Sequence, residues 1–203
     1  MVPSKRLIPA ALALVLTVLM SACASKPFLK IQYQLPPSST ALTGESIFLR
    51  ISDQRNDPAF LSANAKNSLK DFNDTYSLVV LHDDGSGNLI GAYDLNSLWN
   101  EIFKQRLQNE GVTVSASEEI TDANLVIQIK VFKLDIVDRK WVLQMSYQAG
   151  LSRNNTVIAK ESVNGSAERL KVMGKSDAEK VLGELVTDMV NKLDVAQLFR
   201  QAQ

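Results

Sequence analysis

The sequence predicts an α+β fold: an antiparallel or mixed β-sheet with two amphipathic helices packed on one face. Several segments in the middle of the chain alternate apolar and polar residues, which is typical of half-buried strands. Two longer segments, 94–111 and 176–193, repeat apolar residues every three or four positions, which is typical of helices that cover a sheet. The chain is 45% hydrophobic, which suffices for one core in a domain of this length.

The first 22 residues have the layout of a secretory signal peptide. Lys5 and Arg6 give a positive start, residues 7–20 carry no charge, and two small residues precede Cys23. As a helix, residues 7–20 are about 21 Å long, which is too short for a bilayer core of about 30 Å. We therefore expect a signal peptide at 1–22 rather than a transmembrane helix.

Cys23 is the only cysteine in the chain, and it directly follows this segment. The sequence from Met20 to Cys23 resembles a bacterial lipobox. That resemblance implies a thiol alkylated with diacylglycerol, cleavage before Cys23, and acylation of the new amino group by a fatty acid such as palmitate. One acyl chain binds a membrane only weakly, whereas two or more anchor a protein stably. Cys23 is thus the expected lipidation site, and the alternative is a structural cysteine in an ordinary secreted protein.

The residue after Cys23 is Ala24 rather than aspartate. In lipoproteins of Gram-negative bacteria this lack of a retention signal implies transfer to the outer membrane, with the domain in the periplasm. Removal of residues 1–22 leaves 20 basic against 22 acidic residues, so the charge balance disfavours a nucleic-acid partner. The expected partners are the membrane, through the anchor, and a protein of the cell envelope.

Residues 23–44 are expected to be the lipidated N-terminus and a tether rich in proline and serine. The alternating stretch 28–35 inside it can add an edge strand. Phe28 and Tyr33 within that stretch are candidates for contact with the membrane or a partner. Residues 45–203 are expected to form a single periplasmic domain.

The domain opens with an alternating strand at 46–52, which the turn-forming segment 53–58 ends. Residues 59–75 are polar and predict a surface loop with a short helix within 61–72. In 76–93, two apolar runs flank a cluster of turn-forming residues, which predicts a β-hairpin.

The helix at 94–111 carries its apolar residues on one face, with Asp94 suited to the N-cap and Gly111 to the position after the C-cap. A short strand at 112–116 leaves it. Trp99 lies on the apolar face and is expected in the core.

Three long strands should follow as an antiparallel meander. In 123–138 the apolar set changes phase near 131–132, which indicates a β-bulge. Residues 141–152 alternate cleanly from Trp141, a further core candidate, and lead through a turn into a strand at 156–167.

The last helix is expected to begin at a capping box of Ser176 and Glu179. Gly183 lies within it and lowers its intrinsic stability by about 1 kcal/mol relative to alanine. The apolar periodicity nevertheless favours a continuous helix to Leu193. Residues 194–201 either extend this helix or form a separate turn.

A family resemblance rests on the order of these features: the lipobox, the tether, and a strand that ends in SDQRND (52–57). The helix that opens with DLNSLWNEIFKQ at Asp94, the long strand NLVIQIKVFKLDI, and a C-terminal helix followed by LFRQ complete it. Together they resemble the YajG-type family of uncharacterised bacterial outer-membrane lipoproteins, over roughly residues 45–203. The resemblance implies the lipid-bearing cysteine, at Cys23, and no established activity.

His82 is the only histidine, and it lies beside Asp83 and Asp84 at the end of a predicted strand. No nucleophile-elbow pattern accompanies it, and adjacent strand residues point to opposite faces. We expect a surface-loop histidine, with catalysis or metal binding as the alternatives. Residues 84–88 match part of a calcium loop, but Leu89 stands where glycine is needed, so a plain turn is favoured. No catalytic, cofactor-binding or metal-binding residue is predicted.

These observations favour a membrane-anchored periplasmic lipoprotein without catalytic activity, which binds or assembles envelope proteins through a sheet edge or the polar sheet face. The alternative is a carrier that holds a lipid or an envelope glycan in a groove between sheet and helices. An apolar pocket larger than packing voids would support that alternative. A third interpretation is an enzyme that uses His82.

Overall fold

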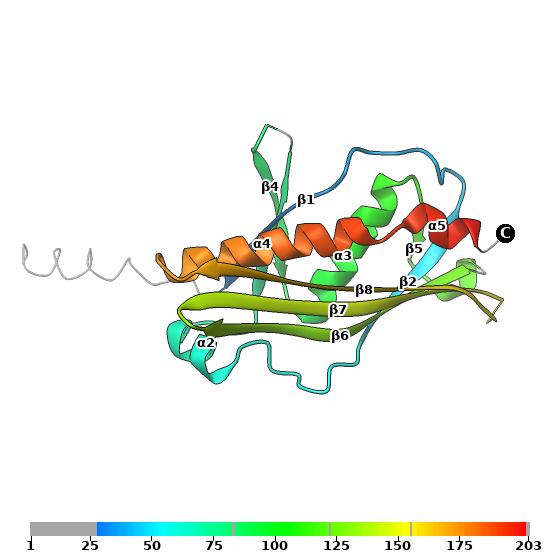
Figure 1. Ribbon diagram of the computed structural model, residues 1–203. Helices are drawn as coiled ribbons and strands as arrows, with labels where there is room; N and C mark the ends of the chain where they lie inside the picture. The colour runs from blue at the N-terminus through cyan, green and yellow to red at the C-terminus, as the bar shows by residue number, and fades with distance from the viewer. Residues whose placement is uncertain (1–27, 83, 122, 155, 202–203) are drawn as a thin grey trace, which may run out of the picture.

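The structure is a computed structural model, and it describes residues 28–82, 84–121, 123–154 and 156–201. The larger sheet of these residues has the strand order β5 (Thr113–Ser115), β2 (Ser46–Asp53), β6 (Ala123–Val137), β7 (Lys140–Arg153) and β8 (Thr156–Leu170). The smaller sheet has the order β1 (Leu29–Gln34), β3 (Tyr76–Leu81) and β4 (Gly87–Tyr93). The predicted α+β class is confirmed, although the strands divide into two sheets (Figure 1).

Strands β6, β7 and β8 form the predicted antiparallel meander, while β2 pairs in parallel with β5 and with β6. The pairing of β6 with β7 shifts by one residue between Ile129 and Val131. This shift is the β-bulge that the change of apolar phase predicts. On β7 every second residue from Trp141 to Leu151 is buried, as the alternation predicts.

Strand β1 pairs in parallel with β3, and β3 and β4 form the predicted antiparallel hairpin. Leu29, Ile31 and Tyr33 of β1 are fully buried, and the Tyr33 hydroxyl donates a hydrogen bond to Gln105 Oε1 at 2.7 Å. The folded unit therefore extends N-terminal of residue 45, into the expected tether. The prediction that Tyr33 contacts the membrane or a partner is wrong, because alternation shows which side chains share a face but not what covers that face.

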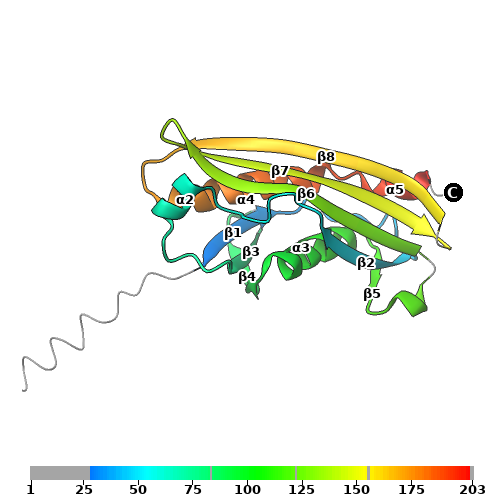
Figure 2. The same ribbon diagram turned by 90° about the horizontal axis from the view of Figure 1, so that it is seen from below.

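Helices α3 (Leu95–Asn109) and α4 (Lys175–Lys192) lie on one face of the larger sheet, as predicted (Figures 1 and 2). Trp99 of α3 and Trp141 of β7 are fully buried in the core, which confirms both predictions. The buried apolar residues of α4 are Ala178, Val181, Leu182, Leu185, Val186, Met189 and Val190.

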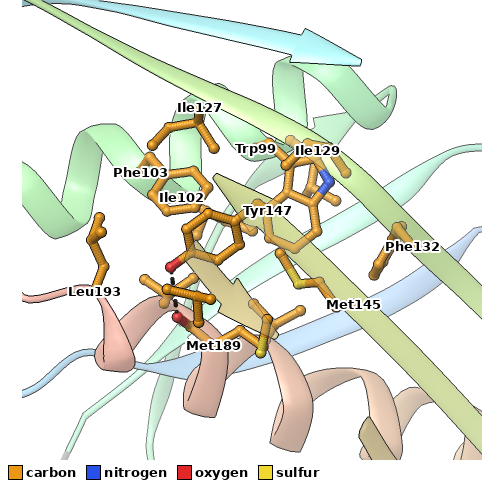
Figure 3. Close-up of a cluster of buried hydrophobic side chains, with 14 of the residues drawn as sticks. Trp99, Ile102, Phe103, Ile127, Ile129, Phe132, Met145, Tyr147, Met189 and Leu193 are labelled. Carbon is orange, nitrogen blue, oxygen red and sulfur yellow. Dashed lines mark hydrogen bonds between the residues drawn. The ribbon is translucent and has the colours of Figure 1, made fainter. Parts of the chain in front are cut away.

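Aromatic side chains fill the space between α3, α4 and the larger sheet (Figure 3). The rings of Phe103 and Tyr147 meet edge to face, with centroids 5.2 Å apart. The Tyr147 hydroxyl donates a hydrogen bond to the Met189 carbonyl at 2.8 Å, and burial raises the pKa of this hydroxyl well above its usual value. This bond joins the centre of the sheet to α4 inside the core.

The ends of α3 are as predicted, whereas the start of α4 is not. Asp94 Oδ1 accepts the Ser97 N–H at 2.8 Å, and Gly111 has the positive φ of +89° that suits glycine after a helix. Helix α4 begins without a side-chain cap. The predicted capping box of Ser176 and Glu179 is therefore wrong, and the Glu179 carboxylate binds elsewhere.

Short helices complete the fold. Helix α2 (Ala63–Ser68) lies within the predicted segment 61–72, and α5 (Val195–Arg200) is separate from α4. A single 3₁₀ turn, η2 (Glu118–Ile120), follows β5. Among the helices of the described residues, none has the length and apolar character needed to cross a membrane.

Candidate functional site

Side chains of α4 cover the outer edge of β1. The Glu179 carboxylate accepts the Lys30 N–H at 2.9 Å, and Thr187 Oγ1 accepts the Gln34 N–H at 3.2 Å. Asn191 Nδ2 donates to the Gln34 carbonyl at 3.0 Å. The three helix residues are spaced by multiples of four, so they lie in one line along α4. They take the place of a neighbouring strand and bind three backbone groups of β1: the Lys30 N–H, the Gln34 N–H and the Gln34 carbonyl.

Gly183 lies in the same line and allows the close approach. A Cβ at this position would stand 2.3 Å from the Gln32 carbonyl oxygen of β1. No larger side chain fits while helix and strand remain in contact. The glycine that weakens α4 in isolation is therefore a packing requirement of the folded protein.

The opposite edge of the smaller sheet is open. Strand β4 is its last strand in the described residues, and the tip of the β3–β4 hairpin projects beyond α4 (Figure 1). Leu89 of β4 is 69% exposed, and Ile90 beside it is also exposed. The register places Val79 opposite Leu89 and Leu78 opposite Gly91, so Ile90 is the extra residue of a β-bulge. Exposed apolar residues on an edge strand are a typical binding feature.

A groove of about 650 Å³ lies between this hairpin, β1 and the start of α4. The exposed surface of its lining is mostly apolar, and its charged residues are Lys30 of β1 and Lys175 and Glu179 of α4. Lys175 Nζ lies 5.2 Å from the centre of the Phe28 ring and 3.8 Å from Glu179 Oε1. The lining residues are Phe28, Lys30, Ser77, Val79, Leu89, Lys175, Ser176 and Glu179. The groove is large enough for part of a small amphiphilic ligand.

His82 lies in the exposed turn of this hairpin, as predicted. Its N–H donates to the Ser86 carbonyl at 2.9 Å, and its Nε2 lies 2.9 Å from Asn88 Nδ2. Asp84 Oδ1 accepts the Ser86 N–H at 2.8 Å, and hydrogen bonds from Ser86 lower the pKa of this carboxyl. These contacts close the turn on itself. Asp83 lies outside the described residues.

The SDQRND segment forms a structural corner at the end of β2. Arg55 donates to both carboxylate oxygens of Asp53, from Nε at 2.9 Å and from Nη2 at 2.7 Å. These hydrogen bonds lower the pKa of the Asp53 carboxyl. Arg55 also lines a second hollow of about 420 Å³ with Tyr76 and Asp94. Because Arg55 is already paired with Asp53, we assign it to the fold rather than to a ligand.

The predicted lipidation site, Cys23, lies outside the described residues, five positions before Phe28. In the described parts of the chain, no three residues among His, Cys, Asp and Glu form a group that suits a metal ion. Sequence patterns gave no signal for the groove or for the covered edge of β1, because both combine residues that lie far apart in the chain.

No protein-family model and no curated protein sequence matches this chain significantly. Among solved structures, it is similar to protein XCC0632 from Xanthomonas campestris, described as DUF330, with a TM-score of 0.55 and 12% identity over 86% of this chain and 95% of that one. A minor lipoprotein from Acinetobacter baumannii gives a TM-score of 0.38 at 9% identity, over 77% of this chain and 95% of that one. Lipoprotein GNA1162 from Neisseria meningitidis gives 0.31 at 17% identity, over 73% and 97%. The first similarity shows a shared fold, and the YajG-type assignment remains a prediction.

Proposed function

We propose that this protein is a lipid-anchored lipoprotein of the bacterial cell envelope, which binds a protein partner along strand β4. The observation that carries the proposal is the open edge of β4 with Leu89 and Ile90 exposed on it. An extended segment of a partner can add to such an edge through backbone hydrogen bonds, with side-chain pockets supplying specificity.

The anchor part of the proposal rests on Cys23 and its lipobox-like surroundings. Ala24 after the cysteine supports an outer-membrane location with the domain in the periplasm, in a Gram-negative host.

We propose binding rather than catalysis as the activity. His82, the only histidine, makes hydrogen bonds within its own turn, through its N–H to Ser86 and its ring to Asn88. These contacts assign it to turn closure. The β4 edge, which no other strand of the described residues covers, instead offers what a binding surface needs: exposed apolar area beside backbone groups that a partner strand can pair with. Burial of a leucine side chain such as Leu89 contributes about 1.5–3 kcal/mol.

The test replaces Leu89 with lysine in the full-length protein and compares cross-linked complexes formed in cells. Leu89→Lys is expected to remove the partner, because a charge would enter an apolar contact. Ile120→Lys is the matched control, since Ile120 is 73% exposed and lies in η2, which the proposal leaves out of the contact. Both substitutions lie at exposed sites, so both variants should keep the stability of the parent.

Two results would argue against this proposal. One is that the parent protein remains monomeric, with nothing attached after cross-linking. The other is that both variants retain the same complexes as the parent. Loss of a complex in Leu89→Lys alone supports binding at β4.

The groove favours a second candidate function, that of a lipid carrier. An acyl chain would lie against Phe28, Val79 and Leu89, with an anionic headgroup near Lys30 and Lys175. This candidate predicts lipid retained on the purified protein, detected by native mass spectrometry. Ser176→Trp would fill the groove and abolish that signal without changing β4. Retention of the same lipid by the Ser176→Trp variant would exclude the groove as its site.

A further inference from the structure

One end of the molecule exposes a group of apolar side chains, which we call the end patch. It consists of Val137, Leu170, Val172 and Met173. Lys140, after the β6–β7 turn, pairs with Leu170, and the Lys171 N–H donates to the Arg139 carbonyl at 2.9 Å. The β6–β7 turn and the β8–α4 loop therefore lie side by side and present these side chains together.

The backbone of the β8–α4 loop is fixed although its side chains are exposed. The buried Asp177 carboxylate accepts the N–H groups of Val172, at 2.7 Å, and of Met173. Trp141 Nε1, inside the core, donates to the Gly174 carbonyl at 3.1 Å. Val172 is nevertheless 80% exposed and Met173 69%. The fold thus holds large apolar side chains in solvent on a rigid support, which is a feature of surfaces that meet an apolar phase.

Charged residues flank the end patch in the same two segments of the chain. Arg139, Lys140 and Lys171 lie in the two adjoining segments, where Asp138 supplies one acid. Lys140 is paired with Glu168 at 2.7 Å. Lys171 Nζ donates to Ser68 Oγ at 2.7 Å, and it lies 5.8 Å from the centre of the Trp141 ring. Basic residues beside exposed apolar ones suit an interface of acyl chains and phosphate headgroups.

The end patch lies close to the point where the chain enters the fold. Lys175, two residues after Met173, contacts the Phe28 ring. Phe28 follows Cys23 by five residues. Five residues span at most about 18 Å even when fully extended. In both views the start of α4, the β6–β7 turn and α2 lie at one end, and the C-terminus lies at the other (Figures 1 and 2). A lipid on Cys23 would therefore hold this end next to the membrane.

We infer that the end patch inserts into the lipid surface beside the anchor and holds the domain in one orientation. The inference rests on the proposed lipidation of Cys23, and its own content is the membrane contact of Val172 and Met173. Several acyl chains already anchor a protein stably, so the end patch contributes orientation rather than attachment. The expected depth is that of interfacial side chains, about 5–10 Å below the headgroup boundary.

The test places an environment-sensitive nitrobenzoxadiazole on a Met173→Cys variant of the full-length protein, extracted from cells and reconstituted into vesicles of phosphatidylethanolamine and phosphatidylglycerol. With Cys23 lipidated, the introduced thiol is the only one in the protein. Val157→Cys is the matched control, because Val157 is an exposed apolar residue, at 54%, at the other end of β8. It lies 13 residues before Leu170, or about 43 Å along the strand.

The probe at 173 is expected to give blue-shifted emission in vesicles, and nitroxide-labelled acyl chains should quench this emission. The probe at 157 should keep the emission that it has in water, with or without the nitroxide. Intact-mass measurement on the same samples reports lipidation of Cys23 independently. A lipidated protein whose probe at 173 stays in water overturns the inference and leaves the anchor standing. A blue shift without quenching by the lipid means that a second copy or another protein covers the patch, which also overturns it. Quenching of both probes would mean that the domain has no single orientation at the membrane, which overturns the inference. An unmodified Cys23 removes the anchor, and the inference with it.

Discussion

At Gly183, local propensity and packing predict opposite effects of the same substitution. In an isolated helix, Gly183→Ala would stabilise by about 1 kcal/mol. In the fold, the new Cβ would stand 2.3 Å from the Gln32 carbonyl oxygen, so α4 and β1 must separate. We expect Gly183→Ala to lower the free energy of unfolding by about 1–3 kcal/mol in urea denaturation. Lys180→Ala, at an exposed position of the same helix, should change it little. A more stable Gly183→Ala protein would show that the two backbones are not in contact.

Asp177 gives a prediction about pH. Hydrogen bonds from the N–H groups of Met173 and Val172 lower the pKa of its carboxyl below the usual value. A lowered pKa contributes stability above the usual aspartate pKa of about 3.9, and this contribution is lost as the pH falls through the folded-state pKa. Asp177→Asn should therefore be less stable than the parent near neutral pH, and the difference should shrink in acid. Chemical denaturation over a pH series measures this, with Asp188→Asn as an exposed control. A deficit that is constant with pH would contradict the role of the charge.

Individual residues were predictable where the signal is local. Asp94, Gly111 and the two tryptophans follow from helix ends and apolar periodicity, and His82 from its turn. Glu179 was not predictable, because its partner, the Lys30 N–H, lies 149 residues away in sequence. The same sequence, Ser176 with Glu179 three residues later, fits both a capping box and a glutamate that binds a strand edge. Only the tertiary structure shows which of the two forms.

At the scale of elements, α4 and β1 are joined by hydrogen bonds between helix side chains and the strand backbone. Glu179→Met would leave the Lys30 N–H without its acceptor, which should cost about 1–3 kcal/mol of stability. Amide hydrogen exchange should show faster exchange at Lys30 than in the parent. Glu184→Met removes a carboxylate from the exposed side of α4 and serves as the control, since its ion pair with Arg169 is a surface one. Equal protection of Lys30 in both variants would mean that the bond is unimportant.

The helices and the meander were predictable because each depends on periodicity within its own segment. Strand β1 lies in a segment predicted to be a tether, since prolines flank it at 27, 36 and 37. Its place at the edge of the smaller sheet agrees with the edge strand that the alternation of 28–35 allowed. Its pairing with β3 joins Leu29 to Tyr76, a parallel contact without a local signal. For the same reason, the sequence suggested a sheet edge as the binding surface but not which edge, because the choice of β4 depends on the strand order.

At the scale of the whole molecule, the anchor decides where the domain works. Cys23→Ser is expected to abolish lipidation, so the protein should leave the membrane fraction and lose the mass of the acyl chains. Intact-mass spectrometry of the membrane extract measures both changes. Ser25→Ala is the control, and this variant should stay in the membrane fraction with the mass of its acyl chains. A parent protein whose mass shows an unmodified Cys23 would remove the proposed location.

The helix that covers β1 also limits how many molecules can join through the smaller sheet. Strand-by-strand growth needs a donor side and an acceptor side on every subunit. Within the described residues, α4 occupies one side of this sheet, and β4 leaves the other free. Addition at β4 therefore stops after one event: a second copy would give a closed pair, and a foreign segment a complex of one to one. If a partner binds at β4 as proposed, this sheet would end the row of paired strands and would not extend it.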